Sequence, residues 1–263
     1  MNRTIFLAAF ILPAFPGVSS IYFFKEHAML KRLLSLMPIV LAGLFPALPA
    51  AAHYIWIERD EMNHARLYFG EYQDQEREVS GGRLDEIKGP QAWLLDANGK
   101  RQELKATRKE NHFDLGVAPD RTLPVIAEEL GYEVKDWTKH GIGIVKPMFY
   151  TRFSPLLGGS ISKPELVLDI LPEGGAPNVF IVYSRNVPLA KAKLMVYAPN
   201  FWMQERHTDE NGRVAITTPW PGQYVLEVIH LEKQAGEFQG QRFEAFRHRA
   251  TLNFNIPPAP HNK

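Results

Sequence analysis

The sequence lacks cysteine altogether, and this absence excludes several kinds of site. With no Cys among its 263 residues, the chain can form no disulfide framework, thiolate metal site or thiol nucleophile. An excess of charge of one sign is also missing, because 30 Lys and Arg face 29 Asp and Glu. No basic stripe or polybasic cluster is present, which argues against nucleic acid and anionic lipid as partners. The fold must therefore rest on its core, and 16 Phe, 9 Tyr and 5 Trp can supply one.

The motifs of common enzyme classes are missing as well. The sequence contains no Gly-x-Ser-x-Gly elbow, Walker motif or dinucleotide-binding glycine pattern. Acidic pairs such as Asp85-Glu86 and Glu128-Glu129 are neighbours on charged segments. A solvated face explains such pairs better than a glycosidase pair, whose members must face each other across a sugar. We therefore expect a protein that is not an enzyme.

What the chain does contain is an export signal. Met29-Leu-Lys-Arg-Leu-Leu opens with two positive charges and leads into an apolar core, followed by Ala50-Ala-Ala52-His53. A basic start, an apolar core and small residues at a cleavage site make a secretory signal peptide. The core is shorter than the ~20 residues that a membrane span needs. The pattern predicts cleavage after Ala52, a mature chain that begins at His53, and a periplasmic location.

Residues 1–28 precede this signal and carry a second apolar run, Ile5 to Phe15. The run is either a membrane segment or sequence upstream of a true start at Met29. Pro13 and Pro16 interrupt it, which favours the second interpretation. In both cases residues 1–52 are set apart from the fold.

The mature sequence has the pattern of an all-β protein, because it shows no sustained 3.6-residue apolar period and turn signals recur about every ten residues. In the first half the expected strands are 54–58, 65–69, 91–95, 101–107, 112–117 and 142–153. Asp96-Ala-Asn-Gly99 predicts a hairpin, and residues 71–90 predict a long surface excursion. The segment 122–130 is expected as a strand or a short helix, since Ala-Glu-Glu-Leu favours a helix.

The second half predicts seven short strands, which are 166–170, 179–184, 193–198, 201–208, 214–218, 224–230 and 249–256. This number of strands is typical of an immunoglobulin-like or transthyretin-like sandwich, and Asp209-Glu-Asn-Gly-Arg213 is expected to close a hairpin. Pro188-Leu-Ala-x-Ala-x-Leu194, Thr208-Asp-x-Asn-Gly-Arg213 and Pro221-Gly-Gln-Tyr224 follow one another in an order that resembles that of carboxypeptidase-regulatory-like modules. Residues 157–164 form a candidate linker. We thus expect two β-sandwich domains in series, 53–156 and 165–256, and a disordered tail, 257–263.

His53 is the most informative residue because of where cleavage places it. A chain that begins with His offers its α-amine and its imidazole to one ion without any loop-closure cost. The amine has a reference pKa of about 8, so a metal can displace its proton near neutral pH. Nitrogen ligands suit nickel, cobalt or copper. His53 could also be an ordinary first residue of a strand, and the metal interpretation depends on cleavage directly before it.

The other possible ligands are scattered, and no HxH or HxxxH pair supports a closed zinc site. His230 ends an expected strand and Glu71 follows Phe69-Gly70 at the end of another. We take these two residues as candidates to complete a metal site with His53. Each alone is also compatible with an ordinary surface side chain.

The chain resembles a bacterial periplasmic family of unknown function that is related to the substrate-specific component of nickel uptake. The resemblance rests on Ala52-His-Tyr-Ile-Trp-Ile-Glu58, Leu67-Tyr-Phe-Gly-Glu71, Gly131-Tyr-Glu-Val-Lys-Asp-Trp137, Lys146-Pro-Met-Phe-Tyr-Thr-Arg-Phe153, Gly236-Glu-Phe238 and Arg249-Ala-Thr-Leu-Asn-Phe-Asn-Ile256. It implies the handling of nickel, cobalt or a related metal, with His53 as the residue carried over from that component's histidine-containing N-terminus. A membrane metal transporter is the partner it implies.

Three functions therefore stand side by side. The first is a periplasmic metal-binding protein that handles nickel, cobalt or copper and is accessory to uptake or delivery. The second is a non-catalytic structural or partner-binding β-sandwich module of the cell envelope. The third, a copper-dependent oxidase, lacks a second histidine for a copper brace and ranks last. No expected span follows residue 53, so this chain would not carry an ion across a bilayer alone.

Overall fold

The computed structural model describes residues 53–96, 98–155 and 163–258. These residues form strands, turns and three short 3-10 segments, which confirms the all-β prediction. No helix in this described part is long and apolar enough to cross a membrane. The expected signal peptide, most of the expected linker and the end of the expected tail lie outside the described residues.

A nine-stranded sheet forms the centre of the fold. Its path is β15 (Met203–His207), β14 (Lys193–Tyr197), β17 (Gly222–Glu232), β20 (Ala245–Ile256), β10 (Ile144–Phe153), β8 (Val125–Glu129), β4 (Gln91–Leu95) and β5 (Arg101–Leu104), and β9 (Lys135–Asp136) pairs with β10. β10 and β20 pair in parallel at its middle, and the other pairs along this sheet are antiparallel.

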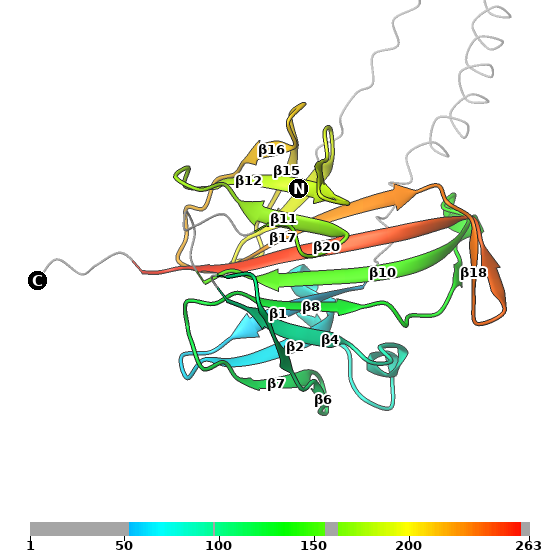
Figure 1. The fold of residues 1–263 in the computed structure, drawn as a ribbon, viewed down its shortest axis with the longest axis horizontal. Helices are drawn as coiled ribbons and strands as arrows, with labels where there is room; N and C mark the ends of the chain where they lie inside the picture. The colour runs from blue at the N-terminus through cyan, green and yellow to red at the C-terminus, as the bar shows by residue number, and fades with distance from the viewer. Residues whose placement is uncertain (1–52, 97, 156–162, 259–263) are drawn as a thin grey trace, which may run out of the picture. The chain divides into compact units, whose positions relative to one another are not determined.

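Two smaller sheets cover the central sheet (Figure 1). One contains β1 (Tyr54–Arg59), β2 (His64–Glu71), β7 (Phe113–Val117) and β6 (Thr107–Arg108), with β3 (Glu76–Arg77) paired to β2. The other contains β11 (Leu168–Pro172), β12 (Val179–Ser184) and β13 (Val187–Pro188), with β16 (Arg213–Ala215) paired to β12. A hairpin of β18 (Gly236–Phe238) and β19 (Gln241–Phe243) extends from the end of β17, and the 3-10 segments are η1 (Tyr72–Asp74), η2 (Arg83–Glu86) and η3 (Thr138–His140).

The alternation of side chains along β4 shows why the fold has three layers. Trp93 and Leu95 belong to the core shared with Leu168 and Phe180 of the β11–β12 sheet. Ala92 and Leu94 belong to a second core, shared with the β1–β2 sheet. Because successive residues of a strand point to opposite faces, the central sheet is buried on both sides. An aromatic cluster of Tyr54, Trp56, Tyr68 and Tyr197 with Val225 fills the remaining contact between β1–β2 and β14–β17.

The two halves that the sequence predicts as separate domains share the central sheet. β10 ends the first half, β20 ends the second, and the two strands pair over nine residues from Val145↔Ala245 to Phe153↔Asn253. The described residues from both halves thus belong to one compact unit. The strands of the second half do pack as two layers, β11–β12–β16 against β14–β17–β20, but the core between them also contains Trp93, Ile126 and Tyr150 of the first half. The immunoglobulin-like or transthyretin-like topology of the second half stays a prediction.

The structure decides one open alternative and differs from two local predictions. The segment 125–129 is strand β8 and not a helix, and four of its five residues are buried. A strand buried on both faces loses the alternation of apolar and polar residues that identifies strands. The turn Asp209–Arg213 joins β15 to β16, but these strands pair with β14 and β12 in different sheets, so it closes no hairpin. The excursion 71–90 is anchored, because its Leu84 and Ile87 are buried.

Candidate metal centre

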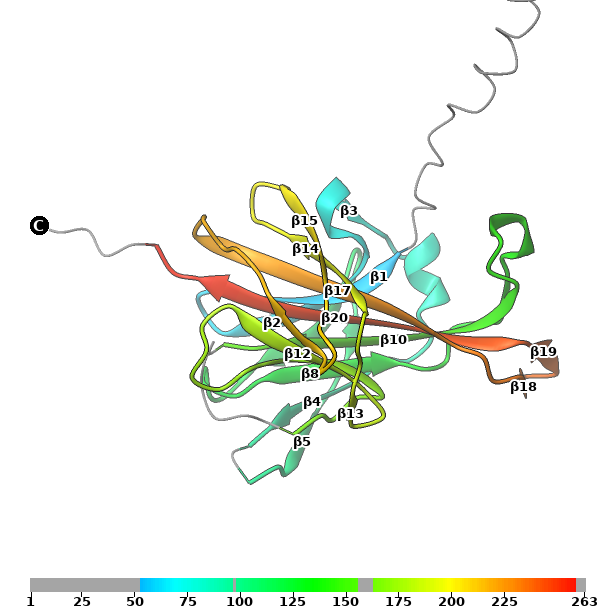
Figure 2. The same cartoon turned by 90° about the horizontal axis from the view of Figure 1, so that it is seen from above.

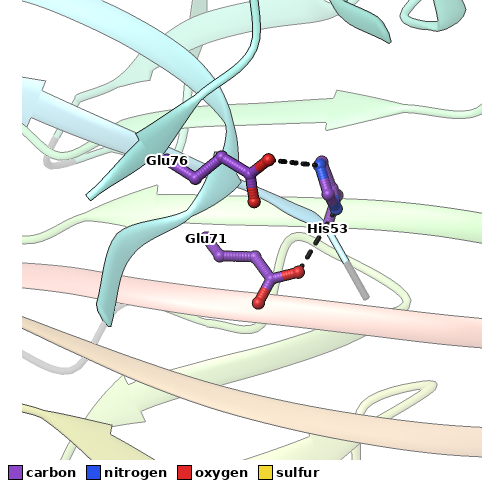
Figure 3. A group of neighbouring side chains, drawn as sticks. All are labelled: His53, Glu71 and Glu76. Atoms are coloured by element: carbon purple, nitrogen blue, oxygen red, sulfur yellow. Dashed lines mark ion pairs between the residues drawn. The ribbon is translucent and has the colours of Figure 1, made fainter. Parts of the chain in front are cut away.

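The pairing of β1 with β2 places His53 beside Glu71. Tyr54 lies opposite Gly70 in this antiparallel ladder, so the residue before Tyr54 and the residue after Gly70 come next to each other. Nδ1 of His53 is 3.3 Å from Oε1 of Glu71, and the two side chains turn toward one another in Figure 3. Both are buried, with His53 7% and Glu71 3% exposed. Two of the three candidate ligands therefore come together.

The central sheet holds the start of β1 in place. Nη1 of Arg249 donates to the carbonyl oxygen of His53 at 3.1 Å, and the Thr251 hydroxyl donates to the carbonyl oxygen of Ile55 at 2.8 Å. Arg249 is itself bound through Nε to Glu227, at 2.5 Å. The His53 ring also packs against Phe69, with 5.3 Å between the ring centres. His53 thus occupies a defined position directly before β1.

Gly70 allows a second strand to approach the site. Its φ is +148°, and a Cβ atom there would lie 2.2 Å from the carbonyl oxygen of Glu76. Only glycine permits both the backbone conformation and this contact. Glu76 and Glu78 lie at alternate positions in the segment that pairs with β2, and both reach His53 at Nε2. The Glu78 carboxylate makes a hydrogen bond with this nitrogen, and Oε1 of Glu76 is 3.7 Å from it.

The site carries more negative than positive groups. Glu71, Glu76 and Glu78 surround the ring, and Arg83 is the cation whose contacts reach it. Nη1 of Arg83 lies 3.2 Å from Nδ1 and 2.9 Å from Nε2 of His53. Because the lone pairs of the two ring nitrogens point apart, a nitrogen nearly equidistant from both lies along neither lone pair. The Arg83 side chain is 49% exposed and also pairs with Glu86 at 3.2 Å, so it can leave the ring without losing every partner.

The Glu71 carboxylate has one oxygen with a hydrogen-bond partner and one without. Its Oε2 accepts from Nε2 of Gln73 at 3.0 Å, whereas its Oε1 is buried with no hydrogen-bond partner. Burial raises the pKa of Glu71 above its ordinary value, and the nearby His53 opposes this change. A buried carboxylate oxygen without a donor costs about 1–3 kcal/mol. An ion or a proton between this oxygen and His53 would remove that cost.

The spacing of these two atoms suits a shared ion. Ligand atoms that each lie ~2.0–2.2 Å from one ion are about 2.8–3.6 Å apart at bond angles between right angles and tetrahedral angles. The 3.3 Å between Nδ1 of His53 and Oε1 of Glu71 falls in this range. His53, Glu71 and Glu76 are also the group of described residues whose ligand atoms all lie within 4.8 Å of one another. The residues present therefore fit a divalent cation.

His230, the third candidate ligand, is not part of this group. It lies directly opposite His248 in the pairing of β17 with β20, and the two rings stack with 6.4 Å between their centres. His248 bonds Tyr150 through Nδ1 at 3.0 Å and Glu232 through Nε2 at 2.9 Å. Residue 249, next along β20, faces His53. Because alternate residues face opposite sides of a sheet, His230 lies on the far face.

Sequence reasoning missed Glu76, Glu78 and Arg83, which all lie in the excursion 71–90. The signal that would have found the two glutamates is their alternation just after Gly70, since residues two apart on a strand share a side. Their proximity to His53 depends on β3 folding back on β2. Arg83 is brought near by η2, which Arg108 anchors through the carbonyl oxygens of Leu84 at 2.7 Å and Ile87 at 2.5 Å.

Comparisons with known proteins leave the family open. No family model matches the chain, and no curated protein sequence matches it. Among solved structures, it is similar to one described as "Biofilm associated protein - BSP domain", with 8% sequence identity and a TM-score of 0.19. The match covers 79% of this chain and 30% of that one. A similarity of this size carries no functional argument.

Proposed function

We propose that this protein is a periplasmic metal-binding protein, accessory to the uptake or delivery of nickel, cobalt or copper. The ion would be held at the start of the mature chain by the α-amine and Nδ1 of His53 and by Oε1 of Glu71. The observation that carries the proposal is the buried Oε1 of Glu71, which has no hydrogen-bond partner and faces Nδ1 of His53 across 3.3 Å.

The donor set supports a first-row transition metal over calcium or magnesium. Two nitrogens and a carboxylate oxygen suit nickel, cobalt or copper, whereas calcium and magnesium prefer sites made of oxygen ligands. A divalent cation would also offset the excess of carboxylates around the ring. The resemblance to the nickel-uptake family points to the same metals, and its implied partner, a membrane transporter, belongs to this proposal.

The α-amine forms only if the signal peptide is removed before His53, so the test controls that position. The full chain is exported with its own signal peptide, and the product is titrated calorimetrically with nickel, cobalt and copper. A variant carries Gly-Ser-Gly-Ser between Ala52 and His53, which moves the amine too far to close a small chelate ring with Nδ1. We expect one tight site in the native product and loss of tight binding in the variant.

Two results would contradict the proposal. Equal affinity in both proteins would show that the amine is not a ligand. No binding of the three metals by a product that begins with His53 would favour a structural or partner-binding module instead. Intact mass of each sample establishes which residue is first.

A further inference from the structure

The two ring nitrogens of His53 face different groups. Nδ1 faces Oε1 of Glu71 at 3.3 Å without a hydrogen bond. Nε2 faces the other way, toward Glu78, with which it makes a hydrogen bond, and toward Glu76 at 3.7 Å. Figure 3 shows Glu71 and Glu76 approaching the ring at its two different nitrogens. One ion cannot lie on both lone pairs, so the site offers two alternative positions.

The covalent structure of a histidine at the chain start decides between them. An ion bound to the α-amine and Nδ1 closes a six-membered ring through Cα, Cβ and Cγ. Nε2 lies on the far side of the imidazole and cannot share an ion with the same residue's amine. The position beside Glu71 is therefore the one that the α-amine can complete.

Binding at Nδ1 requires that this nitrogen carries no proton. A neutral imidazole has one proton, and the hydrogen bond made by one nitrogen determines the role of the other. An ionised carboxylate only accepts, so its hydrogen bond with Nε2 needs the proton on that nitrogen. The Arg83 guanidinium, which only donates, lies 2.9 Å from the same nitrogen but along neither lone pair of the ring. The lone pair of Nδ1 then points toward Oε1 of Glu71. Two acceptors that face each other explain why no hydrogen bond joins them.

Glu78 is placed to do this reliably. Its side chain is 14% exposed, whereas that of Glu76 is 49% exposed and more distant from the ring. Arg83 lies 3.8 Å from the Glu78 carboxylate. Carboxylates that accept from a metal-bound histidine fix its tautomer and orientation and increase its basicity as a ligand.

We propose that Glu78 is a positioning residue of the metal centre, which holds the His53 proton on Nε2 and thereby presents Nδ1 to the ion. Glu78 touches no ion in this arrangement and acts through the ring. The effect on metal affinity rests on the proposed function, whereas the position of the proton is a property of the metal-free protein.

The tautomer can be read directly by nitrogen-15 NMR of histidine-labelled, metal-free protein. The full chain is exported, and the His53 signals are assigned by their absence in His53→Asn. At pH 8.5 we expect a proton on Nε2 and none on Nδ1. A proton on Nδ1, or on both nitrogens, would overturn the inference, and this measurement needs no Glu78 variant.

A matched pair of variants tests the consequence for binding. Glu78→Leu removes the acceptor, so the proton should move toward Nδ1 and the dissociation constant for nickel or copper should rise by about tenfold to a hundredfold. Glu103→Leu, on the exposed part of β5, should change neither. Unchanged tautomer and affinity in Glu78→Leu, or an equal loss in Glu103→Leu, would overturn the inference. If wild type shows the expected tautomer yet binds no metal, the proposed function fails, and only the placement of the His53 proton by Glu78 stands.

Discussion

Replacing Glu71 by glutamine tests whether Glu71 is a metal ligand or a residue that only supports the fold. Glu71→Gln keeps the shape of the side chain and the acceptor for Gln73, and it removes the buried charge. In metal-free protein the lost carboxylate oxygen is one without a hydrogen-bond partner. An amide nitrogen in that position can donate to Nδ1 of His53. We therefore expect the metal-free variant to be as stable as wild type or more stable, by up to about 1–3 kcal/mol.

The effect of metal should run in the opposite direction. An ion present at a hundred times its Kd stabilises the native state by about 2.7 kcal/mol, which raises Tm by ~5–11 °C for a chain of this size. If the variant binds ten times more weakly, the same metal concentration gives about 1.4 kcal/mol, half the shift. A hundredfold weaker site gives about 0.4 kcal/mol, a shift close to zero.

The assay is thermal unfolding of exported wild type, Glu71→Gln and the control Glu103→Gln, each with chelator and with nickel or copper. Glu103 lies on β5 with its side chain exposed, so its variant should follow wild type in both conditions. Two results would refute the reasoning. One is a Glu71→Gln protein that is markedly less stable than wild type in chelator, as a purely structural residue would be. The other is a full metal-induced shift in that variant.

Other perturbations test the supports of the site and the opposite face of the sheet. Gly70→Ala forces a Cβ against the carbonyl oxygen of Glu76, so it should cost about 1–3 kcal/mol in urea unfolding and weaken metal binding; a wild-type profile would contradict the proposed close approach. Arg249→Met leaves the buried Glu227 without this cation and should cost about 3–5 kcal/mol, whereas loss of less than ~1 kcal/mol would mean that the pair does not hold β1. Burial lowers the pKa of His248, so the unfolded chain binds its proton more readily and stability should fall as pH drops below about 6.5. His248→Gln should flatten this dependence of Tm between pH 5 and 7, and an unchanged slope would assign it to other groups.

The sequence predicted many strands well where local patterns determine them. Gln91–Leu95 and Val179–Ser184 have the expected bounds, because turn residues delimit short apolar runs. It did not predict the three layers, since those depend on the parallel pairing of β10 with β20, more than 90 residues apart in the chain. The same burial on both faces explains why 125–129 resembled a helix.

The candidate site was predictable in part for a similar reason. His53 comes directly before β1, and Glu71 is the last residue of β2. Antiparallel pairing places the start of one strand beside the end of the other. Glu76 and Glu78 join them only because Gly70 lets β3 approach closely, a contact that the spacing of residues does not reveal. His230 was assigned wrongly to the group, because its face of the sheet depends on the register of β17 against β20.

Native mass spectrometry of the protein exported from its complete sequence tests the central claim most directly. We predict that the native product begins with His53 and carries one nickel, cobalt or copper ion after exposure to the metal. The form extended by Gly-Ser-Gly-Ser should carry none. A chain that begins at another residue, or equal occupancy in the native and extended forms, would contradict the claim.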